Sequence, residues 1–128
     1  MNLIETKEAP LPGGHYSQAV VSNGLVFVSG ILPLTPNQGQ SIPEGIIAQT
    51  EQIFSNLRAI LKASSSDLDQ LVSVQIFIAN INLWKDIDNI YRKAMGAHKP
   101  ARIVIPCGCS LHYDALIEMS AIAEAGQV

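Results

Sequence analysis

The hydrophobic positions of this chain change period several times, and each change predicts an element. Two short apolar runs, residues 19–21 and 25–28, flank Asn23-Gly24. An Asn-Gly pair between apolar runs is the strongest short-range signal for a β-hairpin. From about residue 44 to 63, apolar residues recur at the spacing of one helix face, with mostly polar residues opposite, and Pro43 suits the first turn of this helix. The apolar face comprises Ile46, Ile53, Leu57, Ile60 and Leu61, and the polar face includes Gln49.

The second half of the chain alternates in the same way between strand and helix. Residues 71–79 follow a period of two, which predicts a strand with one strongly apolar face. A second helix is expected from Asn80 or Asn82 to about Met95, since asparagine is a favourable helix cap. Two further apolar stretches, 100–105 and 116–122, predict core strands joined by a turn around residues 107–114. The apolar face of the first strand comprises Val72, Val74, Ile76 and Ile78, and the stripe of the second helix comprises Trp84, Ile87, Tyr91 and Ala94.

The resulting order, β-β-α-β-α-β-β, predicts an α+β fold in which two helices cover one face of a mixed sheet. The last predicted strand carries apolar side chains on both of its faces: Leu116 and Ile122 lie on one face, and Ile117 and Met119 lie on the other. Helices on one side only would leave a large apolar surface on the other side. Such surfaces usually mark interfaces, so we expect a homo-oligomer.

Composition and charge narrow the class of protein. The 128 residues, 48% hydrophobic and 15% charged, fit a single domain over residues 1–128. A net charge of −3 without a basic run disfavours a nucleic-acid or anionic-membrane partner. The apolar runs are too short for a membrane helix, and the N-terminus is too polar for a signal peptide. Two closely spaced cysteines give no sign of an oxidising compartment, so a cytoplasmic location is expected.

Each of the last two predicted strands carries one charge where a core strand should carry none, Arg102 in the first and Glu118 in the second. A buried charge is costly unless it is paired or holds a ligand. The two residues could form a structural ion pair between adjacent strands. Alternatively, the planar fork of Arg102 could hold the carboxylate of a small acid while Glu118 handles a water molecule.

Other chemistry-bearing residues have both a structural and a functional interpretation. Tyr16 follows a glycine pair that favours a turn, but its ring could wall a pocket. Cys107, Cys109 and His112 could form part of a zinc site or a thiol nucleophile with its base, although the spacing is narrow and a plain turn is favoured. Asn89 faces away from the apolar helix stripe and is expected at the surface.

Four motifs in register resemble the RidA/YjgF family over nearly the whole chain. They are Tyr16-Ser17-Gln18-Ala19-Val20, Val28-Ser29-Gly30, Pro100-Ala101-Arg102 and residues 117–123. The resemblance implies a chorismate-mutase-like α+β fold and a homotrimer with a barrel-like core and sites at the subunit interfaces. It also implies a 2-iminobutanoate/2-iminopropanoate deaminase, which hydrolyses enamine and imine intermediates to 2-keto acids and ammonia without a metal or organic cofactor.

The resemblance also assigns roles to particular residues. Arg102 matches the family's carboxylate-binding arginine, and Glu118 matches the glutamate that positions the attacking water. Tyr16, Ser29 and Gly30 match pocket residues. Two further matches complete the expected substrate-binding set: Asn89, a polar residue near the cleft, and Val104, which would offer its backbone N–H.

The chain departs from the family pattern at several positions. Ile31 replaces a usual glutamine, His15 a proline and Ser120 an acidic residue, and the link from Arg102 to Glu118 is one residue longer. These changes admit a specialised deaminase of a related unsaturated amino acid. A non-catalytic trimer that binds small carboxylates or acts as a chaperone is a further alternative.

Overall fold

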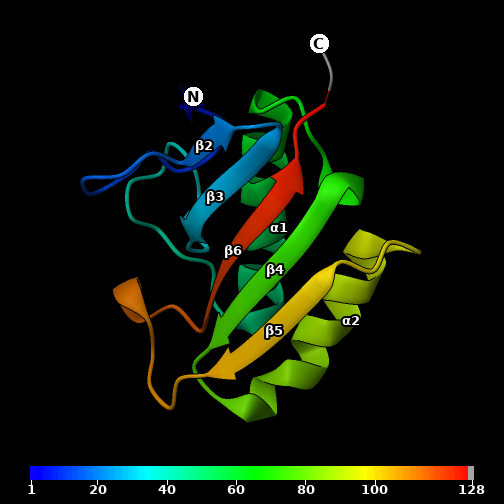
Figure 1. Cartoon of the computed structure of the whole chain (residues 1–128). Helices are drawn as coiled ribbons and strands as arrows, with labels where there is room; N and C mark the ends of the chain where they lie inside the picture. The colour runs from blue at the N-terminus through cyan, green and yellow to red at the C-terminus, as the bar shows by residue number, and fades with distance from the viewer. Residues whose placement is uncertain (127–128) are drawn as a thin grey trace.

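Six strands form one mixed sheet, and two helices cover one of its faces (Figure 1). The computed structural model describes residues 1–126. The strands are β1 (Asn2–Ile4), β2 (Ala19–Ser22), β3 (Leu25–Ile31), β4 (Leu71–Ile78), β5 (Ala101–Pro106) and β6 (Ile117–Glu124), and the helices are α1 (Ile46–Ala63) and α2 (Trp84–Met95). Short 3-10 turns precede β4, α2 and β6. The predicted α+β class is confirmed.

The hairpin and both helices form where the sequence predicts them, with local differences. Asn23 and Gly24 adopt φ of 53° and 77°, the left-handed conformation that a two-residue hairpin turn requires. Helix α1 begins after Gly45, so Pro43 lies outside its first turn. Gln49, predicted on the polar face, is only 5% exposed. Its side chain accepts a hydrogen bond from the Leu116 N–H at 2.8 Å and donates one to the Pro43 carbonyl at 3.1 Å.

The strand order differs from the expected one at the end of the chain. Strand β4 lies between β5 and β6, so the expectation that Arg102 and Glu118 occupy adjacent strands is wrong. Strand β4 pairs with β5 in parallel and with β6 antiparallel. A parallel pair needs a crossover, which α2 supplies, and the crossover carries β5 to the outer edge of the sheet.

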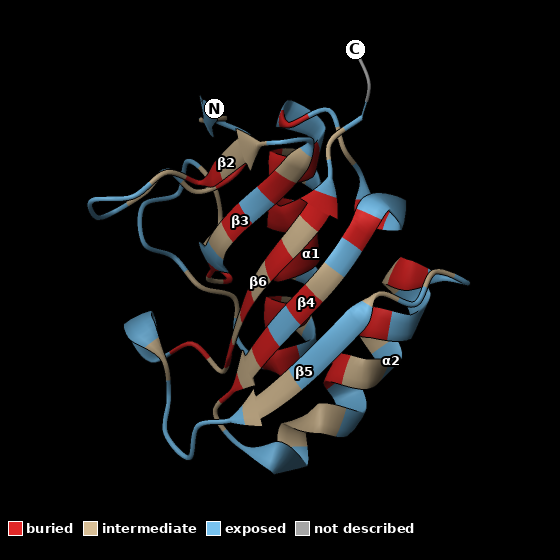
Figure 2. Cartoon of the chain, in the orientation of Figure 1, coloured by how far each residue is buried: buried red, intermediate tan, exposed pale blue. Residues whose placement is uncertain are grey.

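The core lies between the sheet and the helices, and burial alternates along the central strands (Figure 2). Val74 and Ile76 on β4 and Met119 on β6 are buried against the helices. Val72, predicted on the same face, is exposed, because the pairing with β6 is irregular between Leu71 and Ser73. Leu71 is buried there instead.

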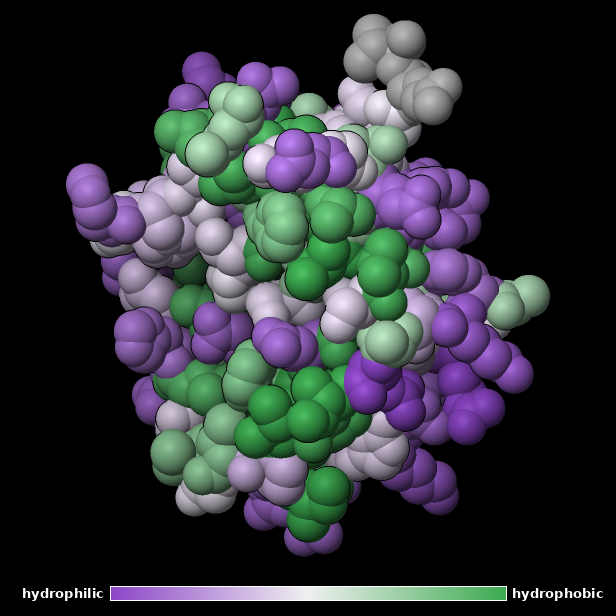
Figure 3. Space-filling model, in the orientation of Figure 1, coloured by the Kyte–Doolittle hydropathy of each residue, from purple (hydrophilic) through white to green (hydrophobic). Residues whose placement is uncertain are grey.

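The opposite face of the sheet carries apolar side chains without a cover in the single chain. Phe27 on β3 pairs with Ile122 on β6, and Phe27 is 43% exposed. Ile103 on β5 is 53% exposed. Figure 3 shows hydrophobic patches on this face with polar surface between them. The predicted apolar surface is therefore present.

Candidate active site

A glutamate lies against a glycine on the open face of the sheet. Glu118 pairs with Phe77 across β6 and β4, and its side chain packs over Gly30 of β3. Strand β3 shifts register against β6 between Val28 and Ile31, at the position of this glycine. A Cβ atom at Gly30 would lie 3.3 Å from Glu118 Cδ and would collide with Oε2. Only glycine leaves room for the carboxylate here.

Burial sets the protonation chemistry of this carboxylate. Desolvation raises the pKa of Glu118 above its ordinary value, and the charge of His112 opposes this with a smaller lowering. A carboxylate with a raised pKa is a better proton acceptor at neutral pH than an ordinary one. The position therefore suits a general base.

The residues next to Gly30 line a cleft of about 440 Å³. Tyr16 and Ser29, both predicted pocket residues, line it, together with His112 and Tyr113 from the loop before β6. The Ser29 hydroxyl donates to the Ser17 carbonyl at 2.6 Å, which fixes the loop that carries Tyr16. The structure thus brings Tyr16, Ser29 and Gly30 together in one cleft. Glu118 is not among the lining residues and contacts the cleft wall at Gly30.

Gln18 is a buried residue that lines this cleft and connects two of the segments around it. Its side-chain oxygen accepts from the Thr6 N–H at 2.7 Å, and its amide donates to the Pro10 carbonyl at 2.8 Å. Its backbone carbonyl accepts from the Ser29 N–H at 3.0 Å. Gln18 thus joins the N-terminal segment, through its side chain, to the strand that bears the glycine, through its backbone.

Arg102 forms a second cluster with helix α2. Its guanidinium carbon lies 4.8 Å from the ring centroids of both Trp84 and Tyr91, a cation–π distance. Nη1 lies 3.6 Å from Asp88 Oδ1, and the arginine side chain is 33% exposed. Burial raises the pKa of the Tyr91 hydroxyl, which is buried without a hydrogen-bond partner among the described residues; the Arg102 charge opposes this rise.

The two clusters lie on opposite faces of the sheet. Arg102 pairs with Val74, whose side chain faces the helices, whereas Glu118 pairs with Phe77, which faces the other way. The ion pair of Arg102 within residues 1–126 is with Asp88. The alternative of a structural Arg102–Glu118 ion pair is therefore wrong.

The remaining predicted binding residues lie on the Arg102 side. Val104 packs partly against the core from β5, and Asn89 is exposed on α2. Asp88, one residue before Asn89, makes the contact with Arg102 and was not predicted. Trp84, Asp88 and Tyr91 follow a spacing of four and three residues, so the helix period alone could have placed Asp88 on this face.

Of the three residues considered for a zinc or thiol site, His112 lines the cleft, whereas Cys107 and Cys109 are not among its lining residues. Cys107 and Cys109 are free and exposed. Within residues 1–126, no three His, Cys, Asp or Glu side chains gather as a metal site would require. In the same residues, no helix is long and apolar enough to cross a membrane.

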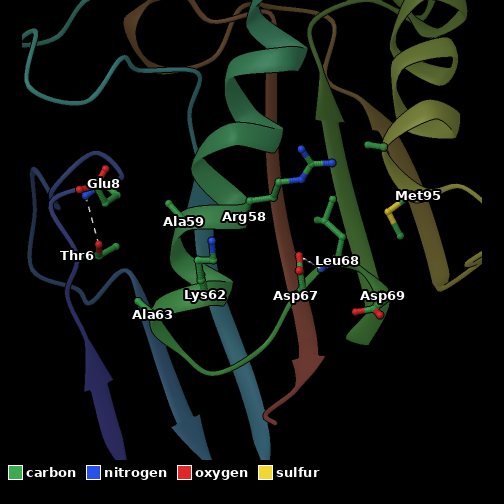
Figure 4. A pocket seen from close by; sticks show the side chains of 11 residues that line it. Thr6, Glu8, Arg58, Ala59, Lys62, Ala63, Asp67, Leu68, Asp69 and Met95 are labelled. Carbon is green, nitrogen blue, oxygen red and sulfur yellow. Dashed lines mark hydrogen bonds between the residues drawn. The ribbon is translucent and has the colours of Figure 1, made fainter.

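A larger hollow of about 820 Å³ lies elsewhere, between the N-terminal segment and the two helices (Figure 4). The residues that line it include Arg58 and Lys62 of α1 and three acidic residues, Glu8, Asp67 and Asp69. None of the predicted site residues lines this hollow.

Comparison with known proteins identifies the family. The model of the family described as Endoribonuclease L-PSP matches residues 6–125. The chain is 39% identical over 121 residues to Reactive Intermediate Deaminase A of Arabidopsis thaliana, covering 94% of this chain and 64% of that protein. The chain belongs to the RidA/YjgF family. Another RidA/YjgF relative, the 2-iminobutanoate/2-iminopropanoate deaminase of Rattus norvegicus, is 34% identical over 124 residues, covering 97% of this chain and 90% of that protein.

A RidA/YjgF structure with a ligand shares this fold. Escherichia coli TdcF with bound serine superimposes with a TM-score of 0.91 at 29% identity, covering 98% of this chain and all of that one. A relative in the family thus binds a small molecule, and two relatives are named as deaminases, one of them for imino acids. The description of the family names an endoribonuclease instead, so membership alone does not assign an activity.

Proposed function

We propose that this protein is a 2-iminobutanoate/2-iminopropanoate deaminase whose site is built from two copies of the chain. The observation that carries the proposal is the half-buried Glu118 carboxylate, packed over Gly30 at the cleft with a raised pKa. The names of the relatives support the reaction class.

A homotrimer would bring together Arg102 and Glu118, which lie on opposite faces of the sheet in a single chain. In a chorismate-mutase-like trimer, the apolar open faces of three sheets cover one another in a barrel-like core. Edge strand β5 of one copy then meets the cleft of its neighbour, so that Arg102, Asn89 and Val104 of one copy face Glu118 of the other. Exposed Phe27 and Ile103 support the assembly, because burying apolar surface drives association. The free, exposed cysteines suit a cytoplasmic protein.

The proposed mechanism needs positioning and one acid/base group. Arg102 binds the substrate carboxylate with two parallel hydrogen bonds and sets the imine carbon beside a water molecule. Glu118 accepts a proton as the water oxygen adds to that carbon. Glu118 passes that proton to the nitrogen, which gives a carbinolamine. It then transfers the proton of the new hydroxyl to the same nitrogen as the C–N bond breaks and the C=O bond forms, so the products are a 2-keto acid and ammonia. Tyr16, Ser29 and Gly30 wall the cleft.

The direct test follows the decay of 2-iminobutanoate and 2-iminopropanoate generated in situ. Wild type is expected to accelerate hydrolysis over buffer, and Arg102→Ala and Glu118→Gln are each expected to lose about 100-fold or more in kcat/KM. A wild type that gives no acceleration refutes the deaminase. A Glu118→Gln variant with wild-type rates, alongside an inactive Arg102→Ala variant, refutes the water-activating role of Glu118 alone.

A mixing experiment tests the shared site. Arg102→Ala and Glu118→Gln chains are unfolded together, refolded as mixed assemblies and assayed. If each site takes its arginine and its glutamate from different copies, about one quarter of the sites at equal mixing carry both wild-type residues. The chain with both substitutions, refolded alone, is the matched control and should stay inactive. Failure of the mixture to regain activity, with light scattering showing mixed trimers, contradicts the shared site.

A further inference from the structure

The cleft lined by Gly30, the residue that Glu118 contacts, is larger than the smallest imino acids require. Its volume of about 440 Å³ falls within the range of roughly 300–1,000 Å³ typical of clefts that enclose drug-sized ligands. A four-carbon acid fills only a small part of such a cleft. Most of the side chains that line it are apolar or aromatic, including Leu11, Tyr16, Ile31, Leu34 and Tyr113.

Tyr113 stands out among these because its backbone is strained. It adopts φ 60° and ψ 26°, and Asp114 follows with φ 58°. Two consecutive residues other than glycine in the left-handed region are unfavourable, and such strain persists only where the surroundings impose it. Strained residues cluster at sites that hold ligands.

The Tyr113 side chain lines the cleft and contacts two other segments around it. The Tyr113 hydroxyl accepts a hydrogen bond from Gln40 Nε2 at 3.2 Å. The same hydroxyl would lie 3.6 Å from a Cβ atom at Gly13, on the N-terminal rim. Tyr113 thus links three segments that line the cleft.

The loop beneath Tyr113 is closed and anchored. The Leu111 N–H donates to the Ala115 carbonyl at 2.9 Å, and the Ala115 N–H donates to the His112 carbonyl at 3.1 Å. The next residue, Leu116, donates its N–H to the buried side chain of Gln49. The backbone on either side of Tyr113 is therefore held in place, and the hydrogen bond from Gln40 orients its partly exposed ring.

We propose that Tyr113 is a specificity-determining residue that selects 2-imino acids with branched or aromatic apolar side chains. The inference rests on the proposed function, because the cleft receives the substrate side chain only if Glu118 is the catalytic base. A bulky apolar side chain gains contact with Tyr113 and the other cleft side chains, whereas the methyl or ethyl group of the small imino acids leaves that space to water.

The test compares kcat/KM for 2-iminobutanoate, 2-imino-4-methylpentanoate and 2-imino-3-phenylpropanoate. An L-amino acid oxidase with catalase generates each imine, and semicarbazide trapping reports its decay. Wild type should prefer at least one larger substrate by about tenfold or more, as expected for added apolar contacts in a pocket. Tyr113→Ala should reduce that preference to about threefold or less, and Tyr113→Phe, which keeps the ring, should retain most of it.

A glycine variant separates specificity from folding. Tyr113→Gly relieves the backbone strain, so its unfolding midpoint should equal or exceed that of wild type while the preference is lost. A preference for 2-iminobutanoate in wild type, or an unchanged preference in both Tyr113→Ala and Tyr113→Gly, overturns the specificity role and leaves the deaminase standing. No acceleration with any of the three substrates refutes the proposed function, and this inference with it.

Discussion

The close approach of Glu118 to Gly30 allows a sharp test of the site. We predict that Gly30→Ala lowers kcat/KM for imine hydrolysis by about 100-fold without unfolding the protein. The added Cβ would collide with Oε2 of Glu118, so the carboxylate must retreat by about 1 Å, and a displacement of that size can cost two orders of magnitude in rate. Gly30 does not adopt a positive φ, so alanine adds no backbone strain there.

Two further variants sharpen this test. Gly13→Ala is the comparison at a second cleft glycine. Its new Cβ would meet the Tyr113 hydroxyl at an ordinary 3.6 Å and leave Glu118 in place, so this variant should lose far less activity than Gly30→Ala. In the Gly30→Ala/Glu118→Gln double variant, the effects should not add, since both act through one carboxylate. The assay is semicarbazide-trapped imine decay, with circular dichroism to verify folding. A folded Gly30→Ala variant with wild-type kcat/KM would refute the reasoning.

Three further predictions concern other parts of the molecule. Asp88→Asn removes the carboxylate that competes with the substrate carboxylate for Arg102, so KM for the imino acid should fall by up to about fivefold with kcat unchanged in steady-state assays. A higher KM would show instead that Asp88 orients the arginine. Glu118→Gln should be more thermostable than wild type at pH 7 but not near pH 4. The folded protein raises the pKa of Glu118, so wild type loses stability as the pH rises above about 4.5, whereas glutamine stays neutral. Equal midpoints across pH 4–7 in thermal melts would contradict this. Gln49→Leu leaves the Leu116 N–H unpaired and should cost about 1–2 kcal/mol in urea unfolding, and an unchanged midpoint would count against that hydrogen bond.

Local chemistry explains what the sequence could predict. The Asn23-Gly24 turn needs only two residues that tolerate positive φ, and both adopt it. The apolar stripe of α1, such as Ile53 and Leu57, is buried as its period predicts. Glu118 could be located because a single charge in an apolar strand is costly unless it is paired or holds a ligand. Its carboxylate is indeed half-buried, in contact with Gly30 of the cleft.

Long-range geometry explains what the sequence could not predict. Gln49 looked like a surface residue because its hydrogen-bond partner, Leu116, lies 67 positions away. Arg102 and Glu118 looked adjacent because their strands follow one another in the chain, whereas the α2 crossover placed β4 between them. The helix period places Asp88 on the same face as Trp84, but it does not indicate which strand this face packs against. The contact of Asp88 with Arg102 could therefore be identified only from the structure.

The separation of Arg102 and Glu118 by the thickness of the sheet has a consequence for how the protein would work at low abundance. Under the proposed function, a single chain supplies Arg102 to one site and Glu118 to another, so it has no complete site of its own. Dilution below the dissociation constant of the assembly should therefore abolish activity even though every chain stays folded. Specific activity would then rise with protein concentration before levelling off. The level of expression, and not only the amount of substrate, would decide how much imine is cleared.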